Sequence, residues 1–176
     1  MVKLILVLSV FTVIQSTTIF DFSKESNLSA WNIVNDDVMG GRSESSFGLD
    51  KEGNGEFRGS VSLANNGGFS SVRHRVGKTE ISSYSAFILR IKGDGKEYQF
   101  RAKTSSADYY SYITYIGTNG EWQEVEIAFD SLYPNFRGRR LNMDNYPGEY
   151  LDEIGFLIGN NKEEDFSLLI DWIKIK

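Results

Sequence analysis

Residues 55–63 read Gly-Glu-Phe-Arg-Gly-Ser-Val-Ser-Leu. Phe57, Val61 and Leu63 alternate with polar residues, and successive side chains of a β-strand point to opposite faces of the sheet. An alternation with a period of two predicts a strand that has one buried face and one solvated face. The pattern continues from Phe57 to the end of the chain, and it therefore decides the fold class.

The same pattern recurs between turns that are rich in Gly, Asn and Asp. We predict further strands over residues 68–76, 84–91, 98–102, 109–116, 122–129, 154–158 and 166–173. With residues 55–63 these ranges are eight strands, we expect roughly ten short strands in all, and the sequence contains no convincing long helix. This spacing is typical of an all-β sandwich or jelly roll, and we expect a single domain.

Several turns carry residues that tolerate unusual backbone angles. Asn119-Gly120 predicts a hairpin, because both residues accept a positive φ. Structural turns are also expected at the remaining glycine-rich sites, which are Gly40, Gly41, Gly67, Gly68, Gly93, Asp94 and Gly95.

The N-terminus has the features of a secretory signal peptide. A short basic start is followed by an apolar run from Leu4 to Ile14 and a small residue, Ser16. The run is shorter than the ~20 residues that span a bilayer. We expect residues 1–16 to be removed, which leaves a β-sandwich domain over 17–176 that does not span a membrane. The predicted location is exported (periplasmic, envelope-associated or secreted) rather than mitochondrial; a buried first strand or an uncleaved anchor is the alternative.

Composition excludes several functions. The chain has no cysteine, so disulfides, zinc–thiolate sites and a cysteine nucleophile are excluded. Its net charge of −5 argues against a nucleic-acid partner. His74 is the only histidine, it is flanked by arginines, and we expect it on the surface of a strand. No signature supplies the nucleophile and orienting acid that catalysis would need, so no enzyme is predicted.

Six segments, in order, resemble the complex I intermediate-associated protein 30 family. They are residues 35–43, 65–69, 89–95, 122–127, 136–139 and 154–158, within a resemblance that runs from about Phe20 to Lys176. The resemblance implies a galactose-binding-like β-sandwich and a non-enzymatic assembly factor or chaperone with a protein partner. Because the N-terminus predicts export, a carbohydrate-binding module of the cell envelope or secreted space is the alternative function.

Two segments supply the predicted contacts with a partner or ligand. In the first segment these are Asp37, Met39 and Arg42. The carboxylates of Asp36 and Asp37 could instead accept hydrogen bonds from N–H groups within a turn. The second group lies in the long irregular stretch expected over 130–152 and consists of Arg137, Arg139 and Arg140. Guanidinium groups bind carboxylates or phosphates in a planar, bidentate manner. Exposed ion pairs to Asp144, Glu149 or Asp152 are the structural alternative.

Aromatic residues and one acidic loop suggest weaker sites. Tyr109, Tyr110, Tyr112, Tyr115 and Trp122 could form a platform for a sugar, but alternation places Tyr110 and Tyr112 on one face and Tyr109 and Tyr115 on the other. Core packing is expected for one of these faces. Residues 50–55 resemble the start of a calcium loop, yet the twelfth position is valine where such a loop needs glutamate. No cofactor is predicted, and a structural calcium elsewhere is left open without assigned ligands.

Overall fold

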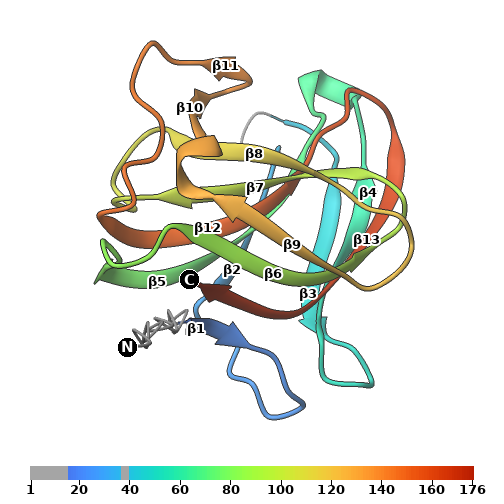
Figure 1. Cartoon of the computed structure of the whole chain (residues 1–176). Coiled ribbons are helices and arrows are strands. Elements are labelled where there is room, and N and C mark those ends of the chain that lie inside the picture. The colour runs from blue at the N-terminus through green and yellow to red at the C-terminus, as the bar shows by residue number, and fades with distance from the viewer. Residues whose placement is uncertain (1–15, 37–39) are drawn as a thin grey trace, which may run out of the picture.

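The computed structural model describes residues 16–36 and 40–176, which form two antiparallel sheets that face each other (Figure 1). The first sheet contains β1 (Thr17–Asp21), β3 (Glu44–Leu49), β4 (Gly55–Val61), β6 (Ala86–Gly93), β9 (Gln123–Ala128) and β13 (Glu164–Ile175). Its order is β3-β4-β13-β6-β9, and β1 also pairs with β13.

The second sheet has the order β11-β10-β8-β7-β12-β5-β2. Its strands are β2 (Trp31–Asn35), β5 (Ser70–Glu80), β7 (Glu97–Lys103), β8 (Ser111–Gly117), β10 (Tyr133–Phe136), β11 (Arg139–Arg140) and β12 (Tyr150–Ile158). In the described part of the chain, the single-turn 3₁₀ helices η2 (Ala64–Asn66) and η3 (Phe129–Ser131) lie in connections between strands. No helix in the described part of the chain is long and apolar enough to cross a membrane.

The core lies between the inner faces of the two sheets. Phe57 and Phe87 of the first sheet and Phe100 and Phe156 of the second are fully buried. The rings of Phe87 and Phe100 are 5.0 Å apart and join the two sheets directly. Burying one such side chain stabilises the fold by about 1.5–3 kcal/mol. The predicted all-β sandwich is therefore confirmed, and the alternation that begins at Phe57 supplies its inner face.

The hairpin predicted at Asn119-Gly120 is wrong. β8 belongs to the second sheet and β9 to the first, so the turn carries the chain from one sheet to the other. Gly120 has a positive φ of 87°, while Asn119 is not among the described residues with a positive φ. A two-residue hairpin with a twist suited to paired strands needs a positive φ at both positions, and only one is present.

The long irregular stretch predicted over 130–152 contains regular structure. β10 pairs with β8 and β11, and β12 begins at Tyr150. Pro134 lies in β10 although proline has no N–H for a sheet ladder. The pairing with β11 involves only Asn135 and Phe136, so proline does not interrupt it. As Figure 1 shows, β10 and β11 project at one edge of the molecule.

His74 is buried, which corrects the surface position expected from sequence. Its exposed fraction is 6%, and its ring stacks on Trp31 of the neighbouring strand at 4.6 Å. Alternation along β5 explains the difference, because Val72 and His74 face the core while the flanking arginines face outward. Burial lowers the pKa of the imidazole, so His74 is neutral at pH 7.

Candidate functional site

A hollow of about 510 Å³ lies on the outer face of the second sheet, and we refer to it as the hollow. This volume lies within the range of ligand-binding sites in proteins. Strands β2, β5, β7, β8, β10 and β12 contribute to it, as do the segments after β2, η2 and β10. Its lining includes Asn35, Asp36, Gly68, Phe69, Arg73, Gln99, Arg101, Lys103, Tyr109, Asn135, Phe136 and Arg137.

Strand register brings two arginines together at the centre of the hollow. Gly155 of β12 pairs with Arg73 of β5 on one side and with Arg101 of β7 on the other. The three residues therefore form one row across the sheet, and their side-chain positions face outward because Val72, Phe100 and Phe156 face the core. A Cβ atom on Gly155 would lie 2.7 Å from the Val72 carbonyl oxygen, so the row needs glycine at its centre.

Sequence reasoning missed this row. In the sequence Arg73 stands out only as a neighbour of His74, and no motif marks Arg101 or Lys103. The available signal was the alternation of Gln99, Arg101 and Lys103 with apolar residues along one strand. The strand order that places β5 and β7 on either side of β12 has no local sequence signature.

Asp36 anchors the rim of the hollow next to β2. Its carboxylate is buried and accepts hydrogen bonds from the Ser43 N–H (3.1 Å), the Ser43 hydroxyl (2.6 Å) and the N–H groups of Gly68 (2.6 Å) and Phe69 (3.3 Å). Burial raises the pKa of Asp36, but these hydrogen bonds lower it more, and the pKa lies below its usual range. Asp36 therefore holds two loops together as a structural carboxylate.

Glycines allow the close approach of backbone to Asp36. A Cβ atom on Gly41 would lie 2.2 Å from Oδ1, and one on Gly67 would lie 2.6 Å from Oδ2. Gly40 and Gly68 have positive φ values of 84° and 138°. Three of the glycines predicted as turn residues, Gly41, Gly67 and Gly68, thus lie against a single carboxylate.

Of the contact residues predicted in the first segment, the structure describes only Arg42. Asp37 and Met39 lie outside the described residues. Arg42 is exposed and precedes β3, and it is not among the residues that line the hollow. Their role in binding stays a prediction.

The second predicted group lies on the projecting arm formed by β10 and β11. Arg137 lines the hollow with its guanidinium 5.3 Å from the centre of the Phe136 ring. Arg140 lies 4.9 Å above the Tyr133 ring, and Arg139 is exposed. Within the described ranges none of the three arginines forms an ion pair, so the alternative of a loop pinned by carboxylates has no support there.

The tyrosines divide between core and surface as alternation predicts. Tyr112 is buried, while Tyr109 and Tyr115 are 65% and 48% exposed. Tyr109 packs edge-on against Tyr110 and Phe136, at interplanar angles of 73° and 87°. These three rings therefore do not share one plane.

Trp122 belongs to the opposite sheet and does not join the tyrosines. It precedes β9, and the Arg90 guanidinium of β6 lies 4.8 Å above its ring. The proposed platform of tyrosines and tryptophan is therefore corrected, because β8 and β9 belong to different sheets.

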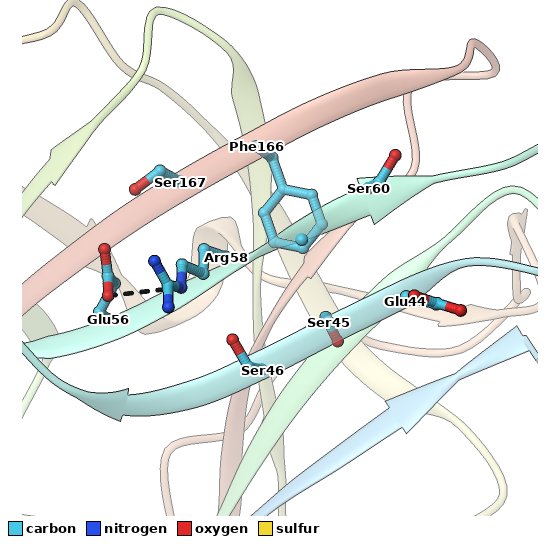
Figure 2. A pocket seen from close by; sticks show the side chains of 9 residues that line it. Glu44, Ser45, Ser46, Glu56, Arg58, Ser60, Phe166 and Ser167 are labelled. Carbon is cyan, nitrogen blue, oxygen red and sulfur yellow. Dashed lines mark ion pairs between the residues drawn. The ribbon is translucent and has the colours of Figure 1, made fainter.

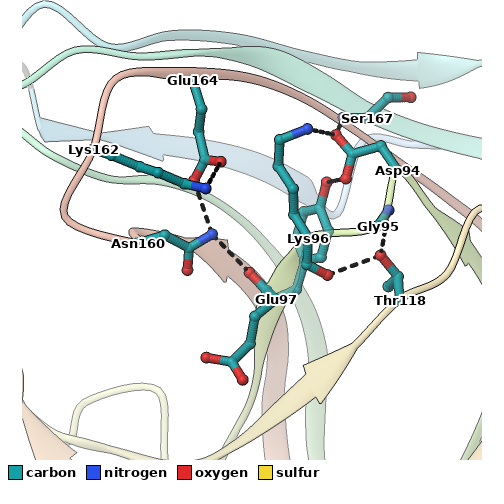
Figure 3. A network of polar contacts seen from close by, with 10 residues as sticks. Asp94, Gly95, Lys96, Glu97, Thr118, Asn160, Lys162, Glu164 and Ser167 are labelled. Atoms are coloured by element: carbon teal, nitrogen blue, oxygen red, sulfur yellow. Dashed lines mark hydrogen bonds and ion pairs between the residues drawn. The ribbon is translucent and has the colours of Figure 1, made fainter.

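The turn Gly93-Asp94-Gly95 links β6 of the first sheet to β7 of the second, and Figure 3 shows the polar contacts around it. Asp94 accepts hydrogen bonds from the Lys96 ammonium (2.6 Å), the Tyr98 hydroxyl (2.9 Å) and the Ser167 N–H (3.0 Å). Burial raises the pKa of Asp94, but these partners lower it below its usual range. Asp94 thus has a structural role in the turn.

A second, shallow depression of about 650 Å³ lies over β3, β4 and β13 of the first sheet (Figure 2). Its lining is mainly short polar side chains, and its one cation, Arg58, forms an ion pair with Glu56 at 3.6 Å. Because Glu56 already compensates the charge of Arg58, this depression presents fewer charged groups for binding a ligand than the hollow does.

Metal-binding groups are sparse. Across residues 16–36 and 40–176, no three His, Asp or Glu side chains gather in a way that could hold a metal ion. Asp50 accepts three hydrogen bonds at 2.8–2.9 Å from the N–H groups of residues 52–54, as expected for an acidic turn.

Sequence comparison assigns the chain to a family. The model of the family described as complex I intermediate-associated protein 30 (CIA30) matches residues 20–170. The chain belongs to the CIA30 family. The mitochondrial complex I intermediate-associated protein 30 of Mus musculus is 22% identical over 184 residues, which cover 92% of this chain and 56% of the mouse protein. The chain thus spans little more than half the length of that CIA30 relative.

Solved structures share the predicted all-β sandwich fold. The family 11 carbohydrate-binding module of cellulase Lic26A-Cel5E from Clostridium thermocellum has a TM-score of 0.66 and 18% identity, with 93% of this chain and 95% of the module covered. A family 11 module from the same organism, in complex with a β-1,3-1,4-mixed-linked tetrasaccharide, has a TM-score of 0.65 and 17% identity, with 93% and 96% covered. At this identity the likeness establishes the fold of the CIA30 chain.

Proposed function

We propose that this CIA30 chain is a non-enzymatic binding domain that holds a protein partner in the hollow, in an assembly-factor or chaperone role. The observation that carries the proposal is the convergence of Arg73 and Arg101, which pair with no carboxylate among the described residues, with the exposed ring of Tyr109 in one concave site. Tyrosine and arginine are the residue types that contribute most to protein interfaces. Family membership supports a partner that is an assembly intermediate.

The geometry of the rings favours a protein over a sugar. A pyranose ring stacks on a flat aromatic surface, whereas Tyr109, Tyr110 and Phe136 meet edge-on. Edge-on rings with a basic rim, which includes Arg137, suit irregular side chains better.

The lining of the hollow supports binding without catalysis. Asp36 is the only carboxylate among its described lining residues, and four hydrogen bonds already occupy it. His74 faces the core on the opposite side of β5. General acid–base catalysis needs a free group within hydrogen-bond reach of the substrate, and neither residue supplies one.

Export through residues 1–16 is part of the proposal and rests on the sequence alone. These residues, except Ser16, lie outside the described part of the chain. The mouse relative is mitochondrial by name, so the compartment of this chain decides which assembly intermediates it can meet.

Site-specific photo-cross-linking in native cells tests the proposed surface. A benzoylphenylalanine at Tyr109 is expected to capture one defined protein. The same group at Tyr150, an exposed tyrosine outside the hollow, is the matched control and should capture little. Equal capture at both positions, or none at Tyr109, would contradict the proposal.

A carbohydrate ligand is the second candidate, and the tetrasaccharide complex of a similarly folded module favours it. The exposed Tyr109 would stack on one sugar ring at the mouth of the hollow. Titration with a mixed-linked β-glucan tetrasaccharide, with and without calcium, tests this candidate. Binding that is lost in Tyr109→Ala would support it, and a blank titration together with a blank glycan array would remove it.

A further inference from the structure

The hollow is lined by the arginines Arg73 and Arg101, and no described carboxylate contacts their guanidinium groups. Arg73 and Arg101 lie two strands apart, which corresponds to about 10 Å between their backbones. Gly155 between them has no side chain and is buried, and the Cγ atom of Arg73 lies 3.4 Å from the position of a Cβ atom on this glycine. The absence of a side chain at Gly155 therefore leaves room for the arginine side chains to approach each other over its backbone.

Within the described residues, no carboxylate oxygen lies within 4 Å of either guanidinium or of the Lys103 ammonium. Arg101 donates from Nη1 to the Gln99 side-chain oxygen at 2.8 Å, and Lys103 donates to the Asp108 carbonyl oxygen at 2.6 Å. Both acceptors are neutral, so Arg101 and Lys103 are oriented by uncharged partners, and Glu153 offsets their charge only from a distance. Most N–H donors of the two guanidiniums therefore have no acceptor among the described residues.

The electrostatics are consistent with an excess of positive charge. Burial and, in second place, the charge of Arg73 bring the pKa of Arg101 to about 10, despite a partial offset by Glu153. Burial also lowers the pKa of Lys103; Glu153 offsets part of this shift, and both arginines add to it. Arg101 stays charged at pH 7, and an anion between the arginines would relieve their mutual repulsion.

We propose that Arg73 and Arg101, above Gly155, form a binding site for a carboxylate that an Asp or Glu side chain of the protein partner provides. This inference rests on the proposed function, because it names the chemistry by which the hollow recognises its partner. The planar fork of a guanidinium matches a carboxylate in a bidentate manner, and two forks can hold one carboxylate from both sides.

Charge beyond the two arginines favours a single acidic side chain over a polyanion. The whole chain carries a net charge of −5, and Asp36, Asp108 and Glu153 lie on strands and loops around the hollow. A uronate polymer would meet repulsion along its length. One or two carboxylates presented by a neutral segment would meet only the cationic centre.

NMR titration of the ¹⁵N-labelled chain at pH 7 tests the site. The probe is the blocked peptide Gly-Ser-Glu-Gly-Glu-Ser-Gly at millimolar concentration, and its glutamine counterpart is the matched control. We expect the glutamate peptide to shift the Gly155 N–H and the Arg101 Nε–H signals in a saturable manner. Equal shifts with the glutamine peptide, or none with the glutamate peptide, would overturn the proposal.

Two charge variants test whether binding of the glutamate peptide depends on Arg101. Arg101→Gln should weaken binding of the glutamate peptide about tenfold or more, because a charge-assisted hydrogen-bonded pair is lost. Arg58→Gln removes the same charge from the opposite sheet and should leave binding unchanged. Equal losses in both variants would indicate attraction by net charge alone and would overturn a site at Arg101. The comparison of the two peptides uses the wild-type chain only, so it still tests the proposal if a variant folds poorly.

Two further probes separate anion classes. Tri-galacturonate or inorganic phosphate that saturates the site at lower concentration than the glutamate peptide would assign it to another ligand and would overturn the proposal.

Failure of the inference is distinguishable from failure of the proposed function. If the hollow binds a partner without this carboxylate, capture by benzoylphenylalanine at Tyr109 persists in Arg101→Gln; if the hollow binds no protein, capture is absent in the wild type as well.

Discussion

Replacing Asp36 by asparagine removes the negative charge that joins the segment after β2 to the loop after η2. The carboxylate accepts four hydrogen bonds, two from Ser43 and one each from the N–H groups of Gly68 and Phe69. An asparagine has one acceptor oxygen, so its NH₂ group must face the N–H of Ser43 or those of Gly68 and Phe69. At least one buried N–H then loses its acceptor.

The magnitude follows from these contacts. A hydrogen bond to a charged group contributes roughly 1.5–3 kcal/mol, and a buried unsatisfied donor costs about 1–3 kcal/mol. Because neighbouring contacts are not additive, we expect Asp36→Asn to lower the free energy of unfolding by about 3 kcal/mol in total. For a domain of this size that corresponds to a fall in Tm of about 6–12 °C.

The pH dependence gives a second, independent readout. The pKa of Asp36 is lower in the folded state than its ordinary value of 3.8, so the unfolded chain binds more protons between the two values. The stability that Asp36 contributes is fully present above about pH 4 and is lost as the pH falls through the folded value. The difference between wild type and Asp36→Asn should therefore shrink below pH 4.

Urea unfolding, followed by tryptophan fluorescence at several pH values, measures both effects. Asp165→Asn changes an exposed carboxylate on β13 and is the matched control, with an expected effect within about 0.5 kcal/mol. A loss below about 1 kcal/mol in Asp36→Asn, or a loss that stays constant from pH 7 to pH 3, would refute the structural role assigned to this carboxylate.

Three more predictions follow from the fold and the N-terminus. Gly155→Ala should lower the free energy of unfolding by about 1–3 kcal/mol, because its Cβ would lie 2.7 Å from the Val72 carbonyl oxygen; a calorimetric scan would show no change if the strand can move away. His74→Phe should reduce the loss of stability between pH 7.5 and pH 5. The pKa of the buried imidazole is lowered in the folded state, so the stability that neutral His74 contributes is fully present above about pH 6.5 and is lost as the pH falls. Equal losses of unfolding free energy in wild type and variant, measured by urea unfolding at both pH values, would contradict this. Mass spectrometry of the native protein should find Thr17 at the N-terminus, and an intact Met1 would remove the prediction of a cleaved signal.

The sandwich could be predicted because the sequence pattern that marks each strand is local. Each strand from Phe57 onward carries its own alternation, and turn residues mark its ends. β10 and β11 escaped prediction because they are short, include Pro134 and form an edge arm. The burial of His74 was missed because the flanking arginines suggested a surface, although alternation alone places their side chains on the opposite face.

The candidate site could be predicted only at its rim. Arg137 lies on a loop-like segment, where an excess of positive charge is visible in the sequence. The pairing of Arg73 with Arg101 through Gly155 depends on strand order and register. Residues 73, 101 and 155 come from three distant parts of the chain, and no local pattern connects them.

The central claim is that the outer face of the second sheet binds a partner. Hydrogen–deuterium exchange of the complex captured at Tyr109 measures this most directly. We predict slower exchange at the backbone around Arg73, Arg101 and Gly155, with the first sheet around Arg58 unchanged. Protection confined to β3, β4 and β13, with the second sheet unaffected, would contradict the account.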